Sequence, residues 1–166
     1  MNYIFLIGMM GAGKSTVGSA LAKELTIPFI DTDEQIVHLE GASVSEIFRL
    51  KGEAYFRGLE KKIIANLSEK PCIVACGGGL PCYGKQMEVL KEKGTVVYLE
   101  GSPELLYKRI EKDFQRPLLT DFKTYQALFE KRQTIYKQAH LRFSVDGQAS
   151  DRTEALKMQL IALGLV

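Results

Sequence analysis

The sequence predicts an α/β fold, in which a parallel sheet is layered between helices. Strand-like and helix-like segments alternate along all 166 residues. Segment 72–76 is a continuous apolar run, typical of a strand buried on both faces of a parallel sheet. The apolar run 3–7 leads through a glycine-rich loop into a helical pattern. Such alternation indicates parallel strands joined by helical crossovers, and the length fits a single domain, 1–166.

The first half of the chain is expected to alternate between short strands and helices. Val17, Leu21 and Leu25 fall on one face of the first helical segment. Ser43 and Glu46 have the spacing of a capping box, which predicts the start of a short helix. The expected elements are strand 2–7, helix 14–25, strand 28–31, helix 34–40, helix 43–52, helix 53–67 and strand 72–76.

The second half continues this alternation around one polar stretch, 113–121, which shows no periodicity. Pro103 falls in the first turn of a predicted helix, where proline is well tolerated. In parallel sheets ligands bind at the carboxyl ends of the strands, so residues that follow a strand are candidates for a site. The expected elements are helix 83–93, strand 95–100, helix 103–112, helix 122–139, strand 142–145 and helix 151–163.

Residues 8–15, GMMGAGKS, match the pattern G-x-x-x-x-G-K-[ST] of a phosphate-binding loop. Glycines let the backbone N–H groups turn inward around an anion, and the following helix adds a partial positive charge. Lys14 is expected to reach the terminal phosphates, and the hydroxyl of Ser15 to bind Mg²⁺. The alternative is a glycine-rich turn that contains Lys-Ser by chance. The strand–loop–helix setting favours the phosphate loop.

Composition and charge exclude several classes of function. The chain has 22 basic and 20 acidic residues without a basic tract, so we expect no nucleic-acid partner. The first apolar run is too short for a signal peptide or a membrane span, so we expect a cytoplasmic protein. Cys72, Cys76 and Cys82 have irregular spacing and are expected to be reduced. His38 and His140 stand alone, and nothing suggests an obligate oligomer, so a monomer is expected.

Asp31 and Asp33 close the second predicted strand, beside the phosphate loop. One carboxylate in this position can help to hold Mg²⁺, directly or through water. The other can accept the proton of a substrate hydroxyl as it attacks the terminal phosphate. We assign Asp31 to the metal and Asp33 to the hydroxyl. The alternative is that the aspartate before Glu34 is simply the cap of a helix.

Arg57 and Glu60 are three residues apart on a predicted helix, so their side chains share a face. A glutamate can orient an arginine so that its remaining N–H groups grip an anion, although a solvated ion pair is the alternative. Gly77, Gly78 and Gly79 follow the third strand and would allow close approach to a ligand, or else form a tight turn. Many phosphate-loop enzymes carry aspartate where Cys76 stands.

Further arginines lie in the second half of the chain. Arg116 falls in the polar stretch, where a mobile lid could bring it to the transferring phosphate, or where it could be an ordinary surface arginine. Lys108 and Arg109 precede this stretch and could flank a nucleotide base or simply be solvated. Arg132 and Tyr136 share a helix face, and Arg132 with Arg57 would give a pocket two cations for a carboxylate.

Taken together, these motifs resemble the shikimate kinase family, in the branch of phosphate-loop proteins related to nucleoside monophosphate kinases. The resemblance covers about residues 2–160. It depends on six segments in the right order: 8–16, Asp31-Thr32-Asp33, Phe56-Arg57-Gly58-Leu59-Glu60, Gly77-Gly78-Gly79, Arg116-Pro117-Leu118-Leu119 and Arg132-x-x-x-Tyr136.

The resemblance implies a three-layer phosphate-loop kinase fold with a five-stranded parallel sheet in the order 2-3-1-4-5. It also implies transfer of the γ-phosphate of ATP to the 3-hydroxyl of shikimate, with Mg²⁺. Lys14, Asp33 and the lid residue Arg116 would be catalytic. The implied shikimate site consists of Asp33, Arg57, Gly78, Gly79, Arg132, Phe48, Phe56 and Glu60, and the implied ATP site consists of Gly11, Ala12, Gly13, Lys14, Ser15, Thr16, Arg109 and Arg116. A helical flap, about 34–60, and a lid, about 113–121, would close over them.

The sequence departs from the family pattern at three places. Cys76 stands where the family usually has threonine or serine, and residues 133–136, QTIY, replace the usual Pro-Leu-Tyr ending. Segment 146–150 matches the adenine loop poorly, so no residue there is assigned. Two rival functions stay open from the sequence: a gluconate or nucleoside monophosphate kinase, and a protein that binds ATP without catalysis.

Overall fold

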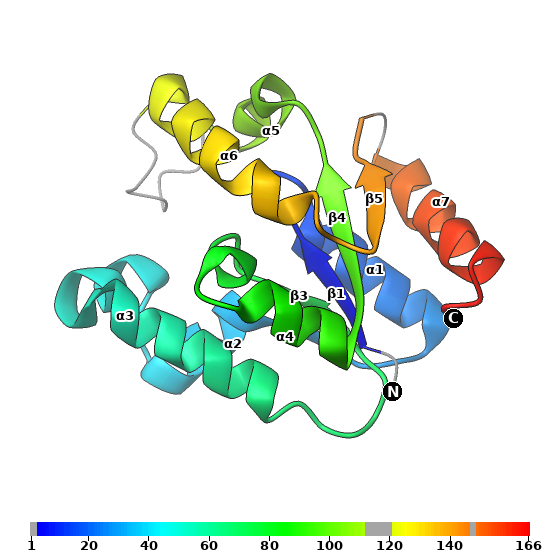
Figure 1. Ribbon diagram of the computed structural model, residues 1–166, viewed down its shortest axis with the longest axis horizontal. Helices are drawn as coiled ribbons and strands as arrows, with labels where there is room; N and C mark the ends of the chain where they lie inside the picture. The colour runs from blue at the N-terminus through cyan, green and yellow to red at the C-terminus, as the bar shows by residue number, and fades with distance from the viewer. Residues whose placement is uncertain (1–2, 112–120, 147–148) are drawn as a thin grey trace.

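The computed structural model describes residues 3–111, 121–146 and 149–166, and side chains within all of these except 149–151. Its five strands form one sheet in the order β2-β3-β1-β4-β5, with every neighbouring pair parallel (Figure 1). This is the order that the resemblance implied. The strands are β1 (Tyr3–Ile7), β2 (Phe29–Asp31), β3 (Ile73–Ala75), β4 (Gly94–Glu100) and β5 (Leu141–Ser144).

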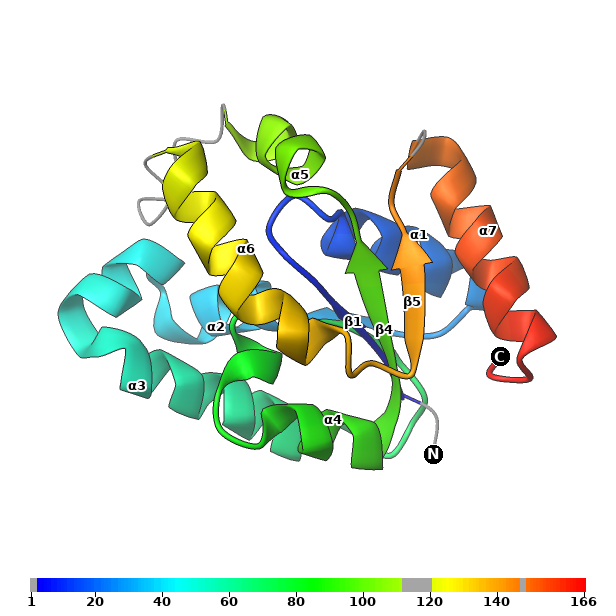
Figure 2. The same cartoon turned by 45° about the horizontal axis from the view of Figure 1, so that its top comes forward.

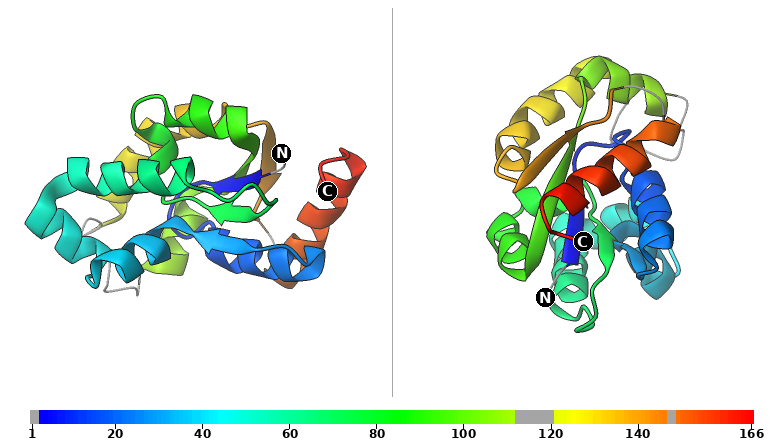
Figure 3. Two further views of the ribbon diagram at one scale, coloured as in Figure 1. Left: turned by 90° about the horizontal axis from the view of Figure 1, so that it is seen from below. Right: turned by 90° about the vertical axis from the view of Figure 1, so that its right-hand side faces the viewer.

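Helices cover both faces of this sheet. In the left view of Figure 3, α1 lies on one side of the strands and α4 on the other. Figure 2 shows α2 and α3 at one end of the molecule and α7 at the opposite end. The helices are α1 (Lys14–Leu25), α2 (Thr32–Glu40), α3 (Val44–Ala65), α4 (Gln86–Lys93), α5 (Pro103–Ile110), α6 (Phe122–Tyr136) and α7 (Ala149–Ala162), with a short 3-10 helix, η1 (Leu80–Cys82).

The core is built around the central strand. All five residues of β1 are buried, as expected for a strand with parallel neighbours on both sides and helices on both faces. Leu6 of β1 pairs with Ala75 of β3 and with Val97 of β4, so the carboxyl ends of these strands lie level. The loops that follow them therefore meet at one edge of the sheet.

Most predicted elements occur within two residues of their expected bounds. The exceptions are the helix expected at 83–93, which begins three residues late, and the helix expected at 122–139, which ends three residues early at Tyr136. Helix α2 begins at Thr32 rather than 34, because Asp31 caps it: the Asp31 carboxylate accepts the N–H groups of Asp33 and Glu34. The helix expected at 83–93 begins only at Gln86. Gly84, between η1 and α4, has a φ of 59°, which interrupts the helical conformation there.

The capping box of α3 is confirmed: Glu46 N–H donates to the Ser43 hydroxyl, and Ser43 N–H donates to the Glu46 carboxylate. The helix runs through the position where two helices were expected to meet, but it is kinked there. Gly52 has a φ of 81° and a ψ of 168°, a conformation that favours glycine. The kink sets residues 44–51 and 53–65 at an angle. Among the described residues, no helix is both long and apolar enough to span a membrane.

Candidate active site

The phosphate loop joins β1 to α1 and lies at the carboxyl edge of the sheet (Figure 1). Gly11 and Gly13 have φ values of 86° and 84°, which explains why the loop requires glycine at both positions. The Lys14 ammonium donates to the carbonyls of Gly8 and Met9 at 2.9 and 3.0 Å. Gly13 caps α1 without a side-chain hydrogen bond, so the helix presents its positive end to this loop.

Asp31 connects the loop to α2. Its Oδ1 accepts the N–H groups of Asp33 and Glu34 at 3.0 and 3.3 Å, while its Oδ2 accepts the Ser15 hydroxyl at 2.5 Å. The alternative that the aspartate just before Glu34 caps the helix is therefore wrong, since the cap lies two residues earlier. Asp31 both caps α2 and contacts the predicted metal-binding hydroxyl, which leaves the Asp33 side chain out of the cap.

Arg57 and Glu60 form a buried pair on α3. The Arg57 side chain donates to Glu60 at 2.6 Å and to Glu53 at 3.0 and 3.2 Å. Arg57 is 6% exposed and Glu60 is 1% exposed, so the alternative of a solvated ion pair is wrong. The Arg57 guanidinium also lies over the rings of Phe48 and Phe56, at 5.8 and 5.6 Å. Two carboxylates and two rings thus fix its orientation.

Burial raises the pKa of Glu60 to about 7, in spite of the opposing attraction of Arg57. The nearby carboxylate of Asp33 raises this pKa further. One oxygen of Glu60, Oε1, is buried without a hydrogen-bond partner among the residues that the structure describes. A buried carboxylate in this state can accept a hydrogen bond from a ligand, or hold a proton near neutral pH.

This shifted pKa gives a prediction for stability. The folded protein holds the Glu60 proton up to about pH 7, whereas the ordinary value is 4.5, so the free energy of unfolding falls as pH rises between these values. Glu60→Gln stays neutral, and we expect it to gain about 1–3 kcal/mol over the parent protein between pH 5 and pH 8. Urea unfolding at both pH values measures the difference.

A matched control is Glu53→Gln, which removes the exposed carboxylate partner of the same arginine. Its stability relative to the parent protein should change little between pH 5 and pH 8. If Glu60→Gln behaved like Glu53→Gln, Glu60 would be ionised throughout this range and the prediction would be wrong.

The glycine triplet leaves room for side chains that line the site. A Cβ at Gly77 would overlap the carboxylates of Asp33 and Glu60, and one at Gly79 would overlap the guanidinium of Arg57. A Cβ at Gly78 would lie 3.1 Å from Nη1 of Arg132. Residues 77–80 do form a tight turn, in which the Leu80 N–H donates to the Gly77 carbonyl at 3.0 Å, but none of the three glycines has a positive φ, so the turn alone does not require glycine. Close packing of charged side chains does.

Arg109 of α5 and Arg132 of α6, two of the predicted site residues, also lie at the carboxyl edge of the sheet. Arg109 donates to the Gly11 carbonyl at 3.2 Å and to the Val145 carbonyl at 2.9 Å, which ties α5 to the phosphate loop and to the end of β5. Arg132 lies beside Gly78. Arg116 and most of the expected lid lie outside the described residues.

Sequence reasoning missed three contacts of the site. The Thr32 hydroxyl accepts the N–H of Gly77 at 2.8 Å, which joins α2 to the glycine triplet. The Tyr125 hydroxyl donates to the carbonyl of Met10 at 2.7 Å, and the Tyr136 hydroxyl donates to the carbonyl of Gly78 at 2.6 Å. Tyr125 lies seven residues before Arg132, on the same face of α6, and this spacing was the available signal.

A model of the shikimate kinase family matches residues 10–161 of the chain. The chain belongs to the shikimate kinase family. A shikimate kinase from Persephonella marina is 45% identical over 151 residues, which cover 90% of this chain and 92% of that protein. One from Sulfurihydrogenibium is 40% identical and covers 88% and 89%, respectively.

Solved structures agree with this membership. A shikimate kinase from Acinetobacter baumannii in complex with shikimate superimposes with a TM-score of 0.87, at 35% identity, covering 99% of this chain and 94% of that one. The enzyme from Bacteroides thetaiotaomicron gives 0.89 at 34% identity, covering 99% of both chains. A gluconokinase from Sinorhizobium meliloti, at 22% identity and a TM-score of 0.67, shares the fold, which confirms the predicted phosphate-loop kinase fold.

This shikimate kinase family member carries Cys76 at the end of β3, where it is fully buried. Burial raises the pKa of its thiol, so the thiol stays protonated near neutral pH. The Nδ1 of His140 accepts the N–H of Val96 at 3.1 Å, in agreement with a structural role. The described residues contain no cluster of three or more histidine, cysteine or acidic side chains that could hold a metal.

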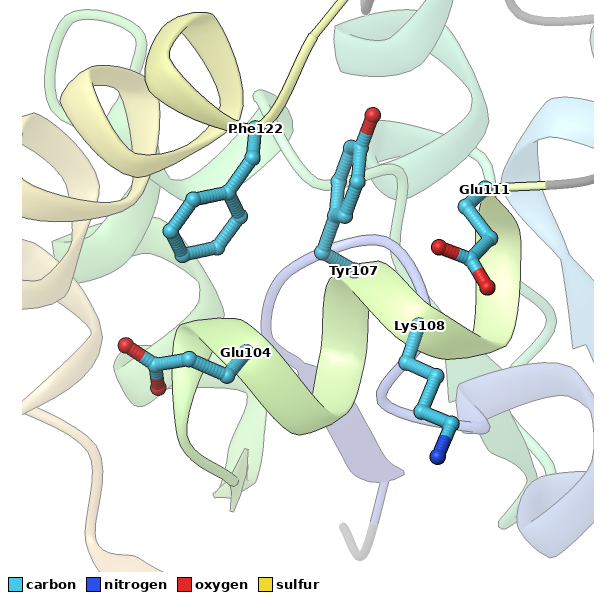
Figure 4. A pocket seen from close by; sticks show the side chains of 5 residues that line it. All are labelled: Glu104, Tyr107, Lys108, Glu111 and Phe122. Atoms are coloured by element: carbon cyan, nitrogen blue, oxygen red, sulfur yellow. The ribbon is translucent and has the colours of Figure 1, made fainter.

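The family member also has a hollow of about 300 Å³ between α5 and α6, away from these residues (Figure 4). It is lined by Glu104, Tyr107, Lys108, Glu111 and Phe122. Of these, only Lys108 was considered in the sequence analysis, as a residue that could flank a nucleotide base. The ring centroids of Tyr107 and Phe122 lie 5.4 Å apart, so this hollow lies where the aromatic side chains of α5 and α6 pack together.

Proposed function

We propose that this chain transfers the γ-phosphate of ATP to the 3-hydroxyl of shikimate, giving shikimate 3-phosphate and ADP. One observation carries the proposal: a buried, oriented arginine, Arg57, lies against Gly79, while the carboxylate of Asp33 lies against Gly77 of the same triplet. An organic acid with a free hydroxyl matches this pairing of cation and carboxylate. Family membership, and the relative from Acinetobacter baumannii in complex with shikimate, support the choice of acid.

The acceptor site is proposed to bind the acid along α3 and the glycine triplet. Arg57 and Arg132 grip the carboxylate, since a guanidinium can donate two parallel hydrogen bonds to it. Phe48 and Phe56, whose rings are 4.8 Å apart, pack along the carbon ring. Gly78 and Gly79 let Arg132 and Arg57 lie close to the backbone, where it can also approach the substrate, and Glu60 holds Arg57 in place.

The donor site is proposed to be the phosphate loop. The backbone of Gly11, Ala12 and Gly13 and the start of α1 at Lys14, Ser15 and Thr16 would hold the phosphates of ATP. The Ser15 hydroxyl and the Asp31 carboxylate are oxygen donors 2.5 Å apart, and they fit Mg²⁺, which prefers oxygen and often takes only one or two protein ligands besides phosphate. Bound there, Mg²⁺ would neutralise charge on the phosphates.

Asp33 is proposed to accept the proton of the attacking hydroxyl, and Lys14 to stabilise negative charge on the transferring group. Arg116, from the lid at 113–121, would add a second cation there, and Arg109 would flank the nucleotide. The helical segment 34–60 is proposed to act as a flap that closes and excludes water, which would otherwise hydrolyse ATP. We place the reaction in the cytoplasm and expect a monomer of one domain.

A coupled ADP-release assay tests the function. With ATP and Mg²⁺, shikimate should support turnover at least 100-fold faster than gluconate or a nucleoside monophosphate. Omission of Mg²⁺ should abolish the reaction. Faster turnover with gluconate or a nucleoside monophosphate would assign the chain to a different kinase, and ATP binding without transfer to any of the three would contradict a catalytic function.

Asp33→Asn is expected to lower kcat for shikimate by about 100- to 1,000-fold, because it removes the proton acceptor and keeps the shape. Glu34→Gln is the matched control: it removes the neighbouring, exposed carboxylate of the same helix turn and should leave kcat within about twofold. Steady-state kinetics measure both. A loss below tenfold for Asp33→Asn would mean that Asp33 only positions the hydroxyl.

A further inference from the structure

We infer that Tyr125 and Tyr136 of α6 are positioning residues, each of which fixes one peptide plane of the site. Tyr125 orients the phosphate loop, and Tyr136 orients the glycine triplet and Arg132. The identity of the ligands, ATP and shikimate, rests on the proposed function. The hydrogen bonds of Tyr125 and Tyr136 do not depend on it.

Both hydroxyls are donors from fully buried side chains. Tyr125 and Tyr136 are each 0% exposed. The Tyr125 hydroxyl donates to the Met10 carbonyl at 2.7 Å, and the Tyr136 hydroxyl donates to the Gly78 carbonyl at 2.6 Å. Burial raises the pKa of Tyr136, so this hydroxyl keeps its proton over the whole working range. Rings from the core hold both side chains: Tyr98 lies 5.2 Å from Tyr136, and Tyr107 lies 5.4 Å from Tyr125.

Each of these carbonyls belongs to a peptide plane whose N–H is a predicted ligand contact. A trans peptide is planar, and its C=O and N–H point in opposite directions. Fixing the Met10 carbonyl therefore turns the N–H of Gly11 away from α6, and fixing the Gly78 carbonyl does the same for the N–H of Gly79. Neither N–H donates to a residue in the described parts of the chain. Both N–H groups can therefore donate a hydrogen bond to a bound ligand.

Tyr136 has a second effect, through Arg132. Arg132 lies one helical turn before Tyr136, and its guanidinium contacts the Tyr136 hydroxyl. Both groups lie beside Gly78: a Cβ there would be 3.1 Å from Nη1 of Arg132 and 3.5 Å from the Tyr136 oxygen. The hydroxyl of Tyr136 therefore holds two predicted contacts of the acid, the N–H of Gly79 and the side chain of Arg132. Tyr125 holds one predicted contact of the nucleotide.

The test measures KM for ATP and for shikimate in Tyr125→Phe and Tyr136→Phe, with Tyr3→Phe as a control. Tyr125→Phe should raise the KM for ATP by about 3- to 10-fold and leave the KM for shikimate within twofold, as expected for loss of one orienting hydrogen bond. Tyr136→Phe should raise the KM for shikimate by about 10-fold and leave the KM for ATP within twofold. Tyr3→Phe is the control, because its hydroxyl also donates to a backbone carbonyl, that of Ser68, and Tyr3 starts β1 at the opposite edge of the sheet. It should change neither KM.

The ratio of the two KM values is the readout, since a partly unfolded preparation lowers the apparent kcat but not KM. Equal changes of both KM values in either variant, or no change in both variants, would overturn the inference. So would a Tyr3→Phe protein that showed the same split. If the parent protein failed to phosphorylate shikimate, the proposed function would be wrong, while binding of a non-hydrolysable ATP analogue would still test Tyr125: a Kd unchanged in Tyr125→Phe would refute its role.

Discussion

Lys14→Ala is expected to lower kcat by about 1,000-fold or more, with a smaller change in the KM for shikimate. The negative charge on the transferring phosphoryl group is greatest in the transition state, so an ammonium placed there acts mainly on kcat. In the structure this ammonium is held by the carbonyls of Gly8 and Met9, within the loop that would surround the phosphates. Steady-state kinetics with ATP and shikimate measure the effect.

Lys23→Ala is the control for Lys14→Ala. Lys23 lies in the last turn of the same helix, α1, and is exposed. It should leave kcat within about twofold. Because Lys14 also contacts the carbonyls of its own loop, the Tm of both variants is compared with that of the parent protein. An unchanged Tm shows that the Lys14→Ala protein is still folded. A folded Lys14→Ala protein with unchanged kcat would remove Lys14 from the mechanism.

The parts of the fold that were predicted from the sequence have local causes. The continuous apolar runs of β1 and β3, and the glycines of the phosphate loop, place strand, loop and helix without any knowledge of distant residues. The capping box at Ser43 and Glu46 likewise involves only four successive residues. The strand order was different: it came from the resemblance, because pairing between strands depends on contacts far apart in the chain.

What the sequence could not decide were contacts between segments. The sequence suggested the aspartate before Glu34 as a possible helix cap, but the cap is Asp31, whose other carboxylate oxygen accepts the hydroxyl of Ser15, sixteen residues away. The glycine triplet was interpreted as a close approach to a ligand, yet it is carboxylates and arginines from α2, α3 and α6 that occupy the space. Whether Arg57 and Glu60 were buried depended on the aromatic residues and glycines packed around them, which no local pattern reveals.

Arg57→Ala is expected to raise the KM for shikimate by at least about 100-fold while the KM for ATP changes less than threefold. A buried guanidinium that grips a carboxylate contributes to binding of the acid alone, and alanine removes every one of its donors. Arg142→Ala is the matched control. Arg142 pairs with Glu100 at 2.8 and 3.0 Å, but it is exposed and lies on β5, the far edge strand. Equal loss for both substrates would argue against a carboxylate grip.

Arg57→Ala also leaves Glu60 buried without its cation, which raises the pKa of Glu60 further. At pH 8, the cost of burying this charge alone, or of protonating it, should destabilise the protein by about 3–5 kcal/mol. The double variant Arg57→Ala/Glu60→Gln separates this effect from binding. It removes the uncompensated charge, so it should recover most of the lost stability in urea unfolding. It cannot restore the donors, so the KM for shikimate should stay high. If the double variant regained both stability and affinity, the effect of Arg57 on shikimate would be an indirect result of misfolding at α3, and Arg57 would not contact the acid.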